Sequence, residues 1–114
     1  MVMKSLSVSS ARTKANPHGI EAKTLLDHDH AVISHILLQP GQALRKHITP
    51  VDVGFYVLEG LGEMEMGGER ETFGPDTMVE SPKGFPHLWR NVGADPLRIL
   101  VIKMPRPAEK SVMI

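Results

Sequence analysis

Short apolar runs rich in Val, Ile, Leu and Phe alternate along the chain with breaks marked by glycine and proline. These breaks recur about every eight to twelve residues, a spacing that is typical of an all-β sandwich or barrel. No stretch of a dozen residues shows the 3.6-residue period of a capped amphipathic helix, so little helix is expected. The predicted strands are 22–26, 31–38, 43–48, 53–58, 62–66, 69–73, 77–80, 87–91 and 97–104.

Two turns are well marked in this pattern. In Gln39-Pro40-Gly41-Gln42, the proline presets φ for the first central position and the glycine is free to adopt a positive φ. The segment Met66-Gly67-Gly68-Glu69 predicts a two-residue β-hairpin. The strand that leads into this hairpin alternates polar and apolar residues, as a half-buried strand does.

The predicted strand Val53–Leu58 is apolar on both of its faces. Because a strand with one face in solvent alternates more cleanly, its second face is expected to be covered, by a second copy in a homodimer or by the N-terminal arm. Three regions are expected. They are a flexible or swapped arm over residues 1–19, a β-barrel over 20–104, and a tail over 105–114 whose apolar end is suited to docking.

Composition narrows the functions that are open to the chain. The 114 residues suffice for one domain with its own core, and Lys plus Arg and Asp plus Glu number 13 each, so the formal net charge is zero. A neutral chain argues against nucleic-acid and membrane partners. Without cysteine there is no disulfide, thiolate ligand or cysteine nucleophile, so any metal would be held by nitrogen and oxygen. The polar segment Met1–Lys14 lacks the apolar core of a signal peptide, which predicts a cytoplasmic protein.

Two stretches carry polar residues and glycines at characteristic spacings. The first contains Gly41, then His47 after five intervening residues, and closes at Gly60. The second contains four spaced residues: Pro82, Gly84, His87 and Asn91. Together they resemble the two motifs of the cupin superfamily over about half of the chain. This resemblance implies an all-β fold, a single double-stranded β-helix of the jelly-roll barrel type.

The resemblance also implies a metal site inside the barrel. In cupins, two histidines and a glutamate of the first motif and the histidine of the second bind one divalent metal. In this chain the second histidine position is Thr49 and the glutamate position is Val53, so His47 and His87 remain. Asp52 directly precedes the glutamate position, and a β-bulge there would turn its carboxylate inward. The implied site is therefore a divalent metal (Fe, Mn, Ni or Zn) held by His47, Asp52 and His87.

Four residues are expected around a substrate pocket: Arg45, Thr49, Val53 and Trp89. Arg45 shares a strand face with His47 and would pair with an anionic substrate, although an exposed arginine near a loop is the simpler interpretation. Trp89 either stacks on a ligand or fills the core. Pairing across the Pro-Gly turn would put Ser34 opposite His47, so His35 is expected to face away from the pocket.

Three hypotheses about function remain open, because this fold supports many activities. The first is a protein that binds a small molecule through a divalent metal held by His47 and His87. The second is a metal-free module that binds or senses a small molecule, which the loss of ligands at Thr49 and Val53 favours. The third is a structural or interaction domain without an active pocket. The sequence assigns neither a catalytic residue nor a reaction.

Overall fold

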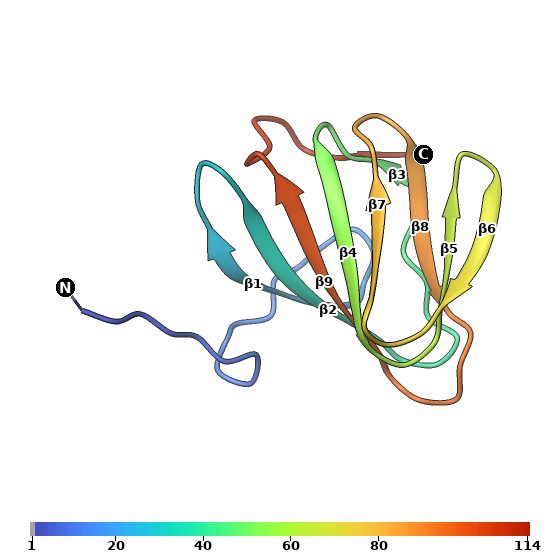
Figure 1. Ribbon diagram of the computed structural model, residues 1–114, viewed down its shortest axis with the longest axis horizontal. Helices are drawn as coiled ribbons and strands as arrows, with labels where there is room; N and C mark the ends of the chain where they lie inside the picture. The colour runs from blue at the N-terminus through green and yellow to red at the C-terminus, as the bar shows by residue number, and fades with distance from the viewer. Residues whose placement is uncertain (1) are drawn as a thin grey trace.

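Two antiparallel β-sheets face each other in the computed structural model, which describes residues 2–114 (Figure 1). The strands are β1 (Glu21–Asp27), β2 (Val32–Leu38), β3 (His47–Ile48), β4 (Asp52–Glu59), β5 (Gly62–Met66), β6 (Glu69–Phe73), β7 (Thr77–Ser81), β8 (Pro86–Asn91), β9 (Leu97–Met104) and β10 (Val112–Met113). The first sheet has the order β1-β2-β9-β4-β7 and the second β10-β3-β8-β5-β6. From β2 to β5 and from β6 to β9, successive strands alternate between the sheets, so this is the double-stranded β-helix that the sequence predicts. Within residues 2–114 there is no helix that could span a membrane.

Eight of the predicted strands form within two residues of their expected ends. The exception is the stretch 43–48, of which only His47–Ile48 is strand. Its first half runs irregularly along β8, with Ala43 bridging to Arg90 and the Leu44 N–H donating to the Trp89 carbonyl. The pattern also missed β10, because two residues are too few to show a periodicity.

Glycines occupy the tightest turns because these turns need a positive φ, which residues with a side chain disfavour. Gly67 and Gly68 have φ of 56° and 88°, which makes the β5–β6 connection the predicted two-residue hairpin. Gly60, which ends the first motif, has φ of 91°, and a Cβ there would lie 2.5 Å from the Pro96 carbonyl oxygen. Any side chain at position 60 would therefore clash with the loop before β9.

Alternate residues of the strands fill the space between the sheets. Val53, Phe55 and Val57 project inward from β4 and are almost fully buried. They meet Trp89 from β8, whose ring centroid lies 5.7 Å from that of Phe55 in an edge-on arrangement. The second-motif residue Asn91 is also buried, and its amide donates to two backbone carbonyls, so its role is to hold loops together.

Both ends of the chain pack on the barrel in part. The start of the described chain extends away from the sheets (Figure 1), but the Val8 carbonyl accepts a 2.8 Å hydrogen bond from Lys23 Nζ of β1. Ala11 is buried and Thr13 bridges to Lys23. The Asn16 amide donates to the Ile20 carbonyl, which turns the chain toward β1. At the other end, the apolar terminus docks as β10 on the edge of β3. The expected arm and tail thus supply part of the wall of the cavity between the sheets.

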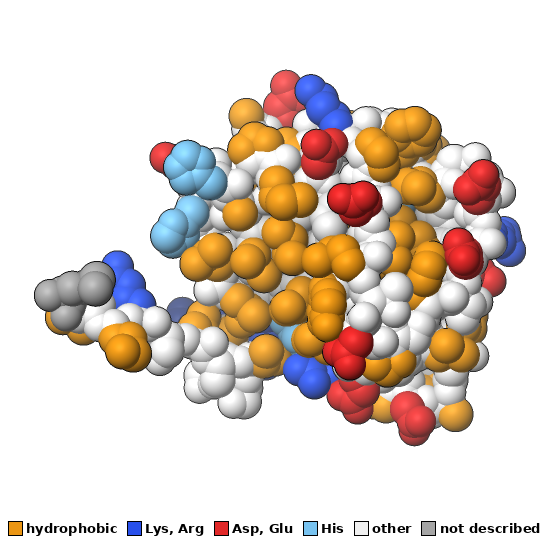
Figure 2. Space-filling model, viewed as in Figure 1, with side chains coloured by type: hydrophobic (Ala, Val, Ile, Leu, Met, Phe, Trp, Pro, Cys, Tyr) orange, Lys and Arg blue, Asp and Glu red, His pale blue; other side chains and the backbone are white. Residues whose placement is uncertain are grey.

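An apolar area covers the outer face of the first sheet (Figure 2). The strand register pairs Tyr56 with both Leu100 and Met78, so these three side chains project to this face. Met78 is 50% exposed. This face belongs to the strand 53–58 that the sequence marks as apolar on both sides.

We predict that a second copy of the chain covers this face. In size-exclusion chromatography with light scattering, the expected mass is twice the 12.6 kDa of one chain. Met78→Glu should shift the protein toward the monomer, because it buries a charge at the predicted interface. Val92→Glu, at a similarly exposed position outside this face, is the control. A monomer at all concentrations would contradict the prediction.

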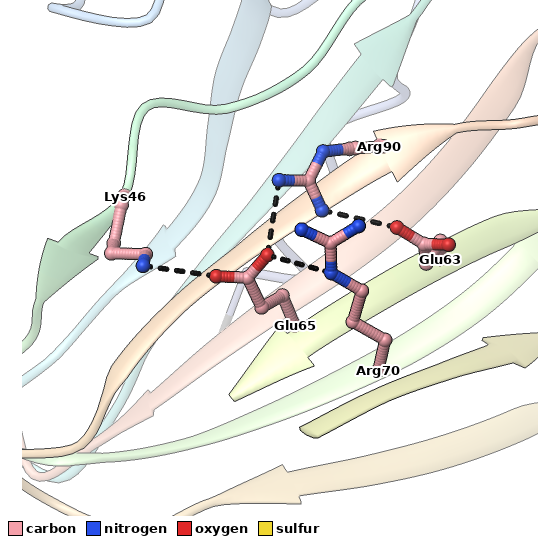
Figure 3. Close-up of polar contacts among 5 residues, drawn as sticks. All are labelled: Lys46, Glu63, Glu65, Arg70 and Arg90. Atoms are coloured by element: carbon pink, nitrogen blue, oxygen red, sulfur yellow. Dashed lines mark hydrogen bonds and ion pairs between the residues drawn. The ribbon is translucent and has the colours of Figure 1, made fainter. Parts of the chain in front are cut away.

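Polar contacts on the outer face of the second sheet centre on Glu65 of β5 (Figure 3). Its carboxylate lies 3.0 Å from Lys46 Nζ, 3.2 Å from Arg70 Nε and 3.0 Å from an Arg90 guanidinium nitrogen. Lys46 and then Arg90 lower the pKa of this carboxyl group. The cluster joins the segment before β3 to β5, β6 and β8, and so supports the two strands that carry His47 and His87.

Candidate functional site

A cavity of about 370 Å³ lies between the sheets, beside the segments where both chain ends pack. Most of its wall is apolar: Pro17, Ile20, Ala22, Ile36, Leu44, Val53, Phe55, Val101 and Met113. Its polar residues are Asn16, His18, Ser34, His47, Thr49, His87, Lys103, Glu109, Lys110 and Ser111. A cavity of this size with a few convergent polar groups is the usual form of a small-molecule site.

His47 and His87 meet inside this cavity because their strands pair there. β3 and β8 are antiparallel with His47 directly opposite His87, and both side chains point inward. The two Nε2 atoms are 3.1 Å apart and the ring centroids 4.5 Å apart. The sequence prediction that these two motif histidines converge agrees with this geometry.

Burial keeps both imidazoles neutral. It lowers the pKa of His47 below its ordinary value of 6.5, and it lowers that of His87 to about 3, with His47 and Lys103 nearby as further causes. Near neutral pH, each ring therefore has one protonated nitrogen and one with a lone pair.

Hydrogen bonds determine which nitrogen carries the proton in each ring. His47 Nδ1 lies 2.8 Å from the Arg45 carbonyl oxygen, which can only accept, so Nδ1 is protonated and Nε2 has the lone pair. His87 Nε2 then donates to His47 Nε2, and it also lies 3.2 Å from Thr49 Oγ1. His87 Nδ1 accepts from the Ser81 hydroxyl at 2.6 Å. One hydrogen-bond chain thus runs from Ser81 through both rings to the backbone of Arg45.

His18 is a third imidazole in the cavity, which sequence reasoning missed. Its ring centroid lies 4.8 Å from that of His47, and its Nδ1 accepts a 2.8 Å hydrogen bond from the Arg45 N–H. Burial, followed by the proximity of His47 and Arg45, lowers its pKa to about 4. The local sequence Asn-Pro-His-Gly signals only a turn. Nothing in it shows that this turn packs against β3.

Lys103, on β9, brings a cation to the same cavity. Desolvation by burial lowers its pKa, and it makes no ion pair with any carboxylate in the described part of the chain. It lies in the interior because it pairs with Val53 of β4, whose side chain points inward. Its position in an apolar run of β9 gave no sign of this role.

Asp52 is the main correction to the expected site. It is exposed, and its carboxylate accepts a 2.8 Å hydrogen bond from the Lys83 N–H instead of facing the cavity. No bulge re-aims it, because β4 is in regular register from Asp52 to Val57. Regular alternation therefore puts Val53 inside and Asp52 outside.

The remaining expected residues divide between the cavity and other places. Thr49 and Val53 line the cavity, as expected. Trp89 does not line it; it is 0% exposed and belongs to the core. The Arg45 side chain is exposed. Arg45 contributes to the site through its backbone N–H and carbonyl, which form hydrogen bonds with the imidazoles of His18 and His47.

His35 lies outside the cavity, as expected, although the pairing used to predict this was wrong. β2 pairs with β1 and β9 and not with β3. His35 Nε2 accepts from Arg98 Nε at 3.0 Å. Ser34, its neighbour, projects the other way and lines the cavity.

The donors at the imidazole pair do not fit a tightly held metal ion. Two nitrogens bound to one ion at about 2.1 Å lie roughly 3.0–3.4 Å apart, which the 3.1 Å separation matches. Retained metals, however, take three or four protein ligands. Within residues 2–114 no group of three His, Asp or Glu side chains is arranged to hold an ion, and Asp52 points away.

Comparison with solved structures gives the same fold throughout. An RmlC-like cupin family protein from Methanocaldococcus jannaschii is 23% identical, with 94% of each chain covered and a TM-score of 0.75. The polyketide cyclase RemF from Streptomyces resistomycificus is 21% identical, with 99% of this chain and 86% of that chain covered and a TM-score of 0.84. A Thermus thermophilus protein is 28% identical, with 92% and 100% covered and a TM-score of 0.78.

Among proteins of curated function, no sequence matches this chain. The family model described as "Cupin domain" matches residues 34–103, which includes both motifs and six of the ten strands in full. With the double-stranded β-helix and the inward-facing histidines of β3 and β8, this match shows that the chain belongs to the cupin domain family.

Proposed function

We propose that the cavity binds a small organic anion directly, through the Lys103 ammonium group and the imidazoles beside it. The observation that carries this proposal is the unpaired cation. Lys103 is partly buried, and its desolvation has a cost that an anionic ligand paired with it would offset. No carboxylate among the described residues does so.

The other walls of the cavity support an organic ligand with an apolar portion. Phe55, Ile36 and Val101 line it, and each comes from the apolar inner face of the first sheet. A volume of about 370 Å³ accommodates a carboxylate that carries a ring or a short chain. Contacts with this wall add affinity without specificity for charge.

The proposal predicts that carboxylates bind more tightly than the matching amides. Phenylacetate and hexanoate are the probes, and phenylacetamide and hexanamide are their uncharged counterparts. In titrations followed by two-dimensional NMR, each acid should bind at least about tenfold more tightly than its amide, since a charge-assisted hydrogen bond contributes about 1.5–3 kcal/mol. Lys103→Met should remove this preference.

The matched control is Lys83→Met, because the Lys83 side chain is exposed and lies outside the cavity lining. If neither acid binds more tightly than its amide, or if Lys103→Met leaves the preference intact, direct anion binding is wrong. Thermal denaturation of each variant shows whether the barrel is still folded.

Binding through a loosely held divalent metal is the second candidate. The 3.1 Å separation of the two Nε2 atoms favours it, as does the hydrogen bond that His47 donates from Nδ1 to the Arg45 carbonyl, an arrangement that is typical of metal-ligating histidines. A metal would also require His87 to change tautomer, so that its Nδ1 donates to Ser81 Oγ instead of accepting from it. Elemental analysis of protein purified without a His tag distinguishes the candidates. Two results together would favour metal-mediated binding over direct anion binding. The protein would hold close to one equivalent of metal per chain, which His47→Ala loses, and a chelator would abolish ligand binding.

A further inference from the structure

The backbone of Arg45 sets opposite tautomers in two neighbouring histidines. Its N–H donates to His18 Nδ1 at 2.8 Å, so in the neutral ring the proton is on His18 Nε2. Its carbonyl accepts from His47 Nδ1 at 2.8 Å, so His47 has its lone pair on Nε2. One residue therefore makes His18 Nε2 a donor and His47 Nε2 an acceptor.

The acceptor on His47 is already occupied. Its Nε2 receives the proton of His87 Nε2, and His87 Nδ1 receives that of Ser81. The two acceptor positions of Thr49 Oγ1 face His87 Nε2 at 3.2 Å and Ser111 Oγ at 3.4 Å. No ring nitrogen of the three imidazoles is consequently free to accept a hydrogen bond from a ligand.

Two donors remain free at the histidine end of the cavity. His18 Nε2 has no hydrogen-bond partner within residues 2–114, and Lys103 has none either. Both residues line the cavity. Glu109 lines it as well, but its side chain is exposed to solvent, where its own hydration competes with a ligand.

We propose that His18 makes the cavity selective for 2-oxo carboxylates over 2-hydroxy carboxylates, because the imidazoles offer a free N–H and no free acceptor nitrogen. This inference rests on the anion-binding function proposed above. The carboxylate pairs with Lys103, and the neighbouring keto oxygen accepts from His18 Nε2. A hydroxyl at the same place also accepts, but its own proton finds no acceptor nitrogen on the neighbouring rings. Burying an unsatisfied donor costs about as much as losing a hydrogen bond.

The tautomers can be measured in the free protein. In two-dimensional NMR of the ¹⁵N-labelled full chain at neutral pH, the ring proton of His18 should be on Nε2 and that of His47 on Nδ1. A proton on His18 Nδ1 would overturn the inference, since His18 would then have an acceptor facing the ligand. This measurement needs no ligand.

The ligand preference is tested with two acids of the same shape and charge. Benzoylformate carries a keto oxygen where mandelate carries a hydroxyl. In NMR titrations benzoylformate should bind about fivefold more tightly, which corresponds to one neutral hydrogen bond. His18→Phe keeps a planar ring without the donor and should abolish the difference. His18→Gln keeps an N–H near the position of Nε2 and should restore part of it.

His30→Phe is the matched control, because His30 is exposed in the β1–β2 turn, and thermal denaturation monitors the fold of each variant. Equal affinities for the two acids in the unaltered protein, or a preference that survives in His18→Phe, would overturn the inference. Either result leaves the proposed function standing if phenylacetate still binds more tightly than phenylacetamide. If no acid binds more tightly than its amide, the proposed function and this selectivity both fall.

Discussion

Replacing Trp89 with alanine is expected to lower the free energy of unfolding by about 4 kcal/mol, which is typical of a fully buried tryptophan. Its side chain is 0% exposed and packs edge-on against Phe55 and Phe73. No backbone shift can close so large a void, because both sheets have strands hydrogen-bonded on either side of this point. Urea denaturation followed by circular dichroism measures the loss.

Trp89→Phe is the matched variant for this prediction. The indole Nε1 is buried without a hydrogen-bond partner, so its removal breaks no polar contact. The expected cost is about 1–2 kcal/mol, from the smaller ring alone. Gly62 provides a second check, since a Cβ there would lie 2.8 Å from the Trp89 ring. Gly62→Ala should destabilise the unaltered protein more than it destabilises Trp89→Ala. A cost below about 1 kcal/mol for Trp89→Ala would show that the core is not packed around this ring.

Acidification from pH 7 to pH 5 is expected to lower the free energy of unfolding by about 2–3 kcal/mol. Burial lowers the pKa of His87 from 6.5 to about 3 and that of His18 from 6.5 to about 4. Below pH 6.5 the unfolded chain therefore binds protons that the folded protein does not. Stability is fully present above 6.5 and is lost progressively as the pH falls toward these lowered values. His87 contributes about 2 kcal/mol, and His18 contributes less because its ring is partly exposed and solvent screens it.

Urea denaturation at pH 7, 6 and 5 measures this dependence. His87→Gln should flatten it, because the amide keeps polar contacts but binds no proton in this range. His30→Gln, at an exposed position, should leave it unchanged. Glu65 acts in the same direction only below about 4.5, since its pKa is lowered from that ordinary value. Equal free energies of unfolding at pH 7 and pH 5 would contradict the burial of neutral His87.

Much of the fold could be predicted from local pattern. Strand β5 packs one face inward and shows the expected alternation of apolar and polar residues, and the hairpin that follows it carries the glycines that positive φ favours. The irregular segment before β3 could not be predicted, because 43–46 has a strand-like composition but contacts β8 through only an isolated bridge at Ala43 and single hydrogen bonds. β10 is held only by its docking on β3.

The candidate site could be predicted for those residues whose orientation depends only on the alternation within their own strand. His47 and His87 occupy motif positions, and simple alternation puts Val53 inside. The same alternation excludes Asp52, which the sequence left open through a bulge that does not form. Trp89 shares a face with His87, and only the packing of Phe55 against it decides that it is core and not cavity wall.

The sequence by itself determined the class of fold, and the resemblance of its two motifs to a known family implied that family and the two histidines of the cavity. The class of fold follows from periodicities within short segments, which the backbone geometry of a strand or turn translates directly into faces and bends. Only the tertiary structure decided that His18 and Lys103 join these histidines and that Arg45 acts through its backbone. Each of these depends on contacts between residues far apart in the chain, and local physical preferences do not encode such contacts.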